Sequence, residues 1–218
     1  MKLCNIKKSH LGVFSSLSLY TKKNRVNFLL KVILASFIAA IGFITNNQES
    51  VIGSMLISPL GGPLMGLIAA LLLFDVGSSL TSILYLILAF ILMIVIGACI
   101  GYFFRNQEPT EEMKKRYSLP DKWTLINAIF VGIVFAIVTL SSGGALVESI
   151  GAGIAISLLP PVVNCGVTLT NQTIDIDIRK KNMWNTFLIT LVNMLGITIS
   201  SIVIFSMYCK NNMLFSWE

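Results

Sequence analysis

The sequence predicts an all-α integral membrane protein with two repeated halves of three membrane segments each (3+3), the second segment of each half being broken by proline. Three observations support this prediction. Charged residues make up 12% of the 218 residues and hydrophobic residues 55%, whereas a soluble domain carries about 25% charged residues. The apolar residues form six long runs, and prolines interrupt the second and the fifth. A similar short signature precedes both interrupted runs.

Each apolar run is long enough, at 1.5 Å per helical residue, to cross a hydrocarbon core of about 30 Å. The six runs are Val26–Thr45, Ser50–Phe74, Val76–Phe104, Trp123–Leu140, Ser149–Thr170 and Asn182–Cys209. The chain then divides into a basic, partly amphipathic amino-terminal arm, a first membrane repeat, a polar linker, a second membrane repeat and a short tail, at residues 1–25, 26–104, 105–122, 123–209 and 210–218.

Prolines predict that the second and fifth segments are broken helices. Ser58-Pro59 and Pro63 interrupt the second segment, and Pro160-Pro161 interrupt the fifth. A proline removes a backbone donor and clashes with the preceding turn. Backbone groups freed in this way are tolerated in a membrane only where protein or a water-filled cavity shields them from lipid. We therefore expect both segments to face the protein interior.

Two similar signatures predict an internal duplication. Glu49-Ser-Val-Ile-Gly53 precedes the first interrupted segment and Glu148-Ser-Ile-Gly151 precedes the second, and the second glutamate lies 99 positions after the first. In both halves an apolar helix leads into the signature, an interrupted segment follows, and one long uninterrupted helix ends the half. This shared order indicates a repeat of three segments plus three.

Two topologies are compatible with the sequence. If all six segments cross, the halves are inverted and the Lys and Arg residues divide evenly between the two sides, which leaves the orientation open. If the interrupted segments dip in and return, four spans remain and the basic residues favour a cytoplasmic amino terminus. The type of membrane stays open in both cases.

The paired interruptions form a candidate substrate- or ion-binding site, because broken helices present backbone carbonyls and helix ends near the midplane. The candidate residues are Ser54, Ser58, Pro59, Gly61, Gly62, Pro63, Ser157, Pro160, Pro161 and Asn164. Alternatively, these prolines and glycines only kink the helices for packing. Glu49 and Glu148 are candidates for ion or proton coupling, with capping of a helix amino terminus as the alternative.

Other polar and small residues have structural interpretations. Asn127 and Asn193 lie inside apolar segments, and we expect them to hydrogen-bond between helices. Gly97 to Gly101 and Gly62 to Gly66 have the spacing of small residues that lets helices approach. This spacing indicates an internal helix contact or the seam of a homo-oligomer.

The charged and nucleophilic residues argue against several other functions. Lys22, Lys23, Arg25 and Lys31 lie just before or within the start of the first apolar run, where we expect them to contact an anionic leaflet rather than a nucleic acid. His10 is the only histidine, and the four cysteines share no metal-ligand spacing. We therefore predict no catalytic residue, no metal site, no cofactor and no enzymatic activity.

Two stretches rich in glycine and proline contain longer motifs. They are Ile52-Gly-Ser-Met-Leu-Ile-Ser-Pro-Leu-Gly-Gly-Pro63 and Gly151-Ala-Gly-Ile-Ala-Ile-Ser-Leu-Leu-Pro-Pro161. Both resemble the signatures of a membrane protein family known as domain of unknown function 389, and Asn193 to Gly196 is similar to an element of the family's last helix. The resemblance extends over roughly Val26 to Tyr208 and implies membrane embedding and a duplicated core. It implies no substrate.

Together these patterns predict a multi-pass transporter or channel for a small solute or ion. The prediction depends on the paired interruptions. The alternative is a non-transporting membrane scaffold or assembly partner that uses the basic arm and the small-residue seams for contacts.

Overall fold

A computed structural model of the protein describes residues 22–142 and 147–214, and the side chains of residues 25–140 and 158–208. This part of the chain is helical and contains no strand. The helices are α2 (Lys22–Ile44), α3 (Gln48–Ile57), α4 (Gly61–Leu73), α5 (Val76–Phe103), α6 (Glu111–Lys114), α7 (Lys122–Ser142), α8 (Val147–Thr170) and α9 (Ile176–Leu214). The predicted all-α fold is confirmed.

Several of these helices have the length and the apolar composition of membrane spans. Four described stretches are long and apolar enough to cross it, and the bent pair α3 and α4 makes a fifth when taken as one span. These stretches leave many large apolar side chains exposed, among them Leu34, Leu84, Phe130 and Ile199. An exposed apolar surface of this extent matches lipid rather than water, so the chain is an integral membrane protein.

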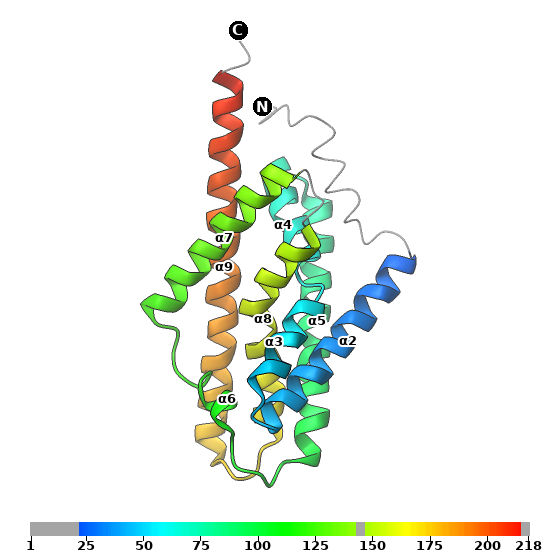
Figure 1. Cartoon of the computed structure of the whole chain (residues 1–218), viewed down its shortest axis with the longest axis vertical. Helices are drawn as coiled ribbons and strands as arrows, with labels where there is room; N and C mark the ends of the chain where they lie inside the picture. Colours follow the sequence, from blue (N-terminus) through cyan, green and yellow to red (C-terminus); the bar gives the residue numbers. More distant parts are fainter. Residues whose placement is uncertain (1–21, 143–146, 215–218) are drawn as a thin grey trace.

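The helices form one elongated bundle (Figure 1). In the view of Figure 1 the chain descends in α2, rises through α3 and α4, descends in α5, rises in α7, descends in α8 and rises in α9. α8 lies centrally, because it packs against α5 and α9 and also contacts α2, α3, α4 and α7. The linker that contains α6 runs across the lower end of the bundle.

The second segment is divided into two helices. α3 ends at Ile57, the backbone of Ser58 is extended, and α4 begins at Gly61, at an angle of 50° to α3. An extended conformation is expected at Ser58 because the residue before a proline is disfavoured in the α region.

The fifth segment differs, and the predicted interruption at its proline pair is wrong. α8 continues from Val147 to Thr170 with Pro160 and Pro161 inside it. An interior proline costs a helix about 3 kcal/mol, but every residue from 158 to 168 of α8 is buried among its neighbours. Tertiary packing therefore holds the helix together where its local sequence disfavours it.

Small residues bring α8 and α5 into backbone contact. A Cβ added to Gly166 would lie 2.2 Å from the Ile94 carbonyl oxygen, and one added to Gly97 would lie 2.4 Å from that of Val163. In the same way, a Cβ on Gly66 would lie 2.7 Å from the Ser82 hydroxyl of α5. The small-residue spacings predicted from the sequence therefore serve internal contacts.

Candidate functional site

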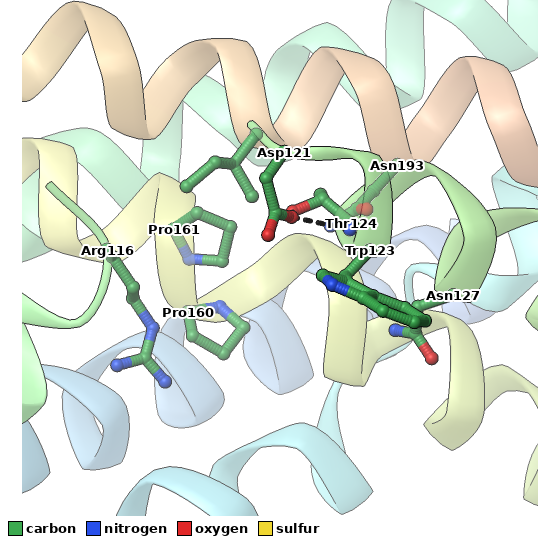
Figure 2. A pocket seen from close by; sticks show the side chains of 9 residues that line it. Arg116, Asp121, Trp123, Thr124, Asn127, Pro160, Pro161 and Asn193 are labelled. Atoms are coloured by element: carbon green, nitrogen blue, oxygen red, sulfur yellow. Dashed lines mark hydrogen bonds between the residues drawn. The ribbon is translucent and has the colours of Figure 1, made fainter. Parts of the chain in front are cut away.

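A pocket with a volume of about 350 Å³ lies among the start of α7, the middle of α8, α9 and the linker before α7 (Figure 2). It is lined by Arg116, Asp121, Trp123, Thr124, Asn127, Pro160, Pro161, Ile189 and Asn193. Most of these residues are polar, although α7, α8 and α9 are apolar helices. Their convergence makes the pocket the candidate site.

The contribution of α8 to the pocket is its proline pair. Pro160 and Pro161 are buried in the bundle and line the cavity. Because neither ring nitrogen carries a hydrogen, the carbonyl oxygens four residues earlier, at Ile156 and Ser157, have no helical donor. In a helix these carbonyls lie one turn away on the face of the prolines. The proline pair therefore removes two helical donors from the part of α8 that meets the pocket.

The start of α7 brings a carboxylate to the pocket. Asp121 Oδ1 accepts hydrogen bonds from the Thr124 backbone N–H and from the Thr124 hydroxyl, both at 2.8 Å (Figure 2). The hydrogen bond from the Thr124 N–H, reinforced by that from its hydroxyl, lowers the pKa of Asp121 below its ordinary value. Asp121 is therefore ionised at neutral pH and caps α7 as an N-cap residue does.

Two asparagines face the same cavity from different helices. Asn127 is exposed on α7, whereas Asn193 is buried on α9. In the view of Figure 2 both amides lie at the right, on the side of Trp123 and Thr124 away from the proline rings of α8. The sequence placed these residues inside apolar segments but did not associate them with the proline pair. The hydrogen bond expected of Asn127 with another helix stays a prediction.

Arg116 in the pocket wall shares a buried acid, Glu112, with Lys115. Arg116 Nη1 lies 3.4 Å from Glu112 Oε2 and also donates to the Glu112 carbonyl oxygen, while the guanidinium lies 4.9 Å from the centre of the Phe43 ring. The Glu112 side chain is 6% exposed and also pairs with Lys115. The hydrogen bond from Lys115, with the charge of Arg116, lowers the pKa of Glu112, and burial lowers that of Arg116.

Long-range hydrogen bonds fasten the linker to the bundle. Asn164 Nδ2 donates to the Met113 carbonyl at 3.2 Å, and Asn185 Nδ2 donates to the Tyr117 carbonyl at 2.8 Å. Other bonds join Thr186 Oγ1 to the Arg116 carbonyl and Thr110 Oγ1 to the Phe43 carbonyl. What the sequence predicts only as a polar linker is therefore an ordered wall of the site.

Only some of the residues predicted for the site line the pocket. Pro160 and Pro161 line the pocket, and Asn164 is fully buried one turn further along α8 with its amide on the linker. The candidates of the first interruption, Ser54, Ser58, Pro59, Gly61, Gly62 and Pro63, do not line this pocket. Ser54 donates instead to the Val51 carbonyl of its own helix.

The predicted charged candidates lie apart from the pocket. Glu49 is exposed in the first turn of α3, where Asn47 Oδ1 accepts from the Ser50 N–H. Arg25 and Lys31 are exposed near the start of α2. The side chains of Glu148, Ser157, Lys22 and Lys23 lie outside the described residues. Among the described residues, no group of histidine, cysteine and acidic side chains could hold a metal ion.

Comparison with known proteins places the chain in a family. The family model described as "Domain of unknown function (DUF389)" matches residues 55–199. A relative from Methanocaldococcus jannaschii, described as an uncharacterized protein, is 28% identical over 203 residues, which cover 93% of this chain, and the chain spans 59% of that relative's length. No solved structure matches the chain. Because the family model matches well over half of the sequence, the chain belongs to the domain of unknown function 389 family.

Proposed function

We propose that the chain is a transporter or channel, passive or ion-coupled, for a small polar solute or ion, with its binding site in the pocket beside Pro160 and Pro161. The observation that carries the proposal is a cavity of about 350 Å³ with polar side chains from two apolar helices in its wall. Small-molecule sites typically have volumes of roughly 300–1,000 Å³. No covalent chemistry is part of the proposal.

The exposure of a polar side chain within an apolar helix supports this proposal. Asn127 is exposed where α7 lines the pocket, and an amide that meets hydrocarbon without a partner is costly. Such a side chain is stable there if the pocket holds water or a polar solute. Polar residues inside membrane segments face bundle interiors and pathways far more often than lipid.

The directions of the helices support an inverted 3+3 repeat as part of the proposal. In Figure 1, the helices of the first half run down, up and down, whereas α7, α8 and α9 run up, down and up. Six crossings in this order would give two halves of opposite orientation, as in many transporters. The bend of 50° between α3 and α4 also supports a crossing, because a re-entrant segment would have to reverse its direction.

Flux measurements with purified protein in vesicles test the proposal. Asn127→Leu and Asn193→Leu each remove an amide from the pocket wall, and we expect either to lower the flux about tenfold, the equivalent of about 1.4 kcal/mol. Thr81→Val is the matched control, because the half-buried Thr81 donates its hydroxyl to the Gly77 carbonyl of its own helix, α5, and does not line the pocket. Equal flux in all three variants would contradict the placement of the site.

The alternative function is a membrane scaffold that moves no solute. Its predicted small-residue seams are occupied inside the chain, since Gly97 and Gly166 join α5 to α8. Absence of flux for a broad panel of small solutes and ions, with protein whose helical content and monodispersity are verified, would favour the scaffold over the transporter.

A further inference from the structure

We infer that the pocket beside the proline pair takes a free zwitterion of the amino acid class, with the solute's carboxylate on Arg116 and its ammonium group on Asp121. This inference rests on the proposed function and assigns the class of substrate to the same site. It follows from three features of the pocket: two opposite charges that are not paired with each other, an apolar surface in the wall, and a small volume.

The cationic side of the wall is formed by Arg116. Its Nη1 lies 3.4 Å from Glu112 Oε2, but Lys115 contacts the other carboxylate oxygen of the same acid. One negative charge is thus shared by two positive ones, so the cation that lines the pocket is not cancelled. A guanidinium binds a carboxylate through two parallel hydrogen bonds. Arg116 is therefore suited to hold the carboxylate of a solute.

The anionic side of the wall is formed by Asp121. Its Oδ1 is oriented by the backbone N–H and the hydroxyl of Thr124, both at 2.8 Å. Asp121 forms no ion pair within 4 Å with Arg116 or with any other side chain that the structure describes. A carboxylate in this position can accept hydrogen bonds from an ammonium group. Two opposite charges therefore line one cavity without neutralising each other.

Apolar surface lies beside the two charges. In the view of Figure 2 the rings of Pro160 and Pro161 lie between the Arg116 guanidinium and the Asp121 carboxylate. Ile189 adds a further apolar side chain to the wall. Small-molecule sites combine such apolar surface with a few polar groups that fix the orientation of the ligand. The aliphatic part of an amino acid can therefore contact this surface while its two charged groups meet the charged side chains.

The size and the charge balance of the pocket favour a small zwitterion over a singly charged solute. The volume of about 350 Å³ lies near the lower end of the roughly 300–1,000 Å³ typical of small-molecule sites. A solute with one charge would displace water from the opposite wall charge without pairing it, which is costly. A zwitterion pairs both charges. The pocket should therefore discriminate against solutes that lack either charged group.

Isothermal titration calorimetry of the purified protein in detergent tests the inference. The probes are alanine, leucine and glutamine and, for the one that binds most tightly, the analogue without the ammonium group and the analogue without the carboxylate. The parent should bind the zwitterion at least tenfold more tightly than either analogue. Asp121→Asn should abolish the preference over the analogue without the ammonium group and retain the other preference. Arg116→Gln should do the reverse.

Both substitutions leave local partners in place. Asparagine is as good an N-cap as aspartate, and Lys115 still pairs with Glu112 when Arg116 is replaced. Asp177→Asn and Lys114→Gln are the matched controls, because both residues are exposed and neither lines the pocket. The controls should keep both preferences of the parent.

Three results would overturn the inference while the proposed function stands. They are equal affinity of the parent for the zwitterion and either analogue, an equal loss of affinity for all three probes in both pocket variants, and no binding of amino acids by a parent that moves other solutes. Absence of flux for solutes of every class would overturn both.

The headgroup of phosphatidylethanolamine also combines an ammonium group with an anionic group. Titrations in nanodiscs of phosphatidylglycerol, with and without phosphatidylethanolamine, distinguish this source from a free solute. An unchanged affinity for the amino acid supports the free zwitterion. A loss of at least tenfold in the presence of phosphatidylethanolamine would assign the pocket to the headgroup and overturn the inference.

Discussion

The contact between α5 and α8 gives the sharpest prediction about stability. A Cβ on Gly166 would lie 2.2 Å from the Ile94 carbonyl oxygen, 2.8 Å from the Ala98 nitrogen and 3.0 Å from the Gly97 Cα. All three are backbone atoms, which cannot rotate away as a side chain can. Ordinary contact begins near 3.4 Å, so Gly166→Ala would force the two helices apart by roughly 1 Å. Overpacking of this kind costs about 1–3 kcal/mol.

Gly53→Ala is the matched control for this substitution. Gly53 also lies inside a helix, but a Cβ there would have no neighbour within 4 Å. Alanine is favoured over glycine inside a helix by up to about 1 kcal/mol, so the control should be neutral or stabilising. Thermal unfolding of the purified protein in detergent measures both. We expect Gly166→Ala to lower the midpoint by several degrees relative to Gly53→Ala, and equal midpoints would refute the assigned helix contact.

Three further predictions concern the linker and a helix cap. Glu112→Gln should destabilise the protein by about 1 kcal/mol, because it weakens the contact with Arg116 while the more exposed Lys115 contact is screened by water. The pKa of Glu112 is lowered in the folded protein, so the ionised Glu112 contributes fully to the free energy of unfolding above the unfolded pKa of about 4.3. This contribution is lost as the pH falls through the folded pKa. The thermal unfolding midpoints of parent and variant should therefore converge in acid. Asn185→Ala removes the bond to the linker backbone, and limited proteolysis should then cleave between Arg105 and Lys122 faster than in the parent; an unchanged cleavage rate would contradict the role of this bond. Asp75→Ala removes the cap of α5, and amide hydrogen exchange should accelerate in the first turn of α5 and not at its end.

Most of the fold could be predicted because the apolar runs are long. The runs beginning at Val26, Val76 and Trp123 correspond to α2, α5 and α7 to within a few residues. The sequence also pointed to Ser58-Pro59, where α3 and α4 separate. It failed at Pro160-Pro161, because the local cost of proline is offset by burial of α8 on several sides, which one segment of sequence cannot reveal.

The site could be predicted only in part. The proline pair was visible as a local anomaly in an apolar run, and Asn193 as a polar residue in a span. The part of the wall formed by Arg116 and Asp121 could not be predicted from the sequence. Its position depends on hydrogen bonds between distant residues, such as the bond from Asn185 to the Tyr117 carbonyl, 68 positions apart. A polar linker with mixed charges has no periodicity that would indicate where it folds back.

In the proposed transporter, water reaches the proline pair through the pocket, and thiol accessibility measures this access. In a protein whose native cysteines are replaced by serine, Asn127→Cys and Asn193→Cys should react with a charged, membrane-impermeant thiol reagent in sealed or inverted vesicles. Leu195→Cys is the control, because Leu195 lies two residues from Asn193 on α9 and is 54% exposed toward the outer surface, where lipid keeps the thiol unreactive. We expect rapid labelling of the two pocket positions and slow labelling of the control, whereas equally slow labelling of all three would mean that water does not reach the proline pair.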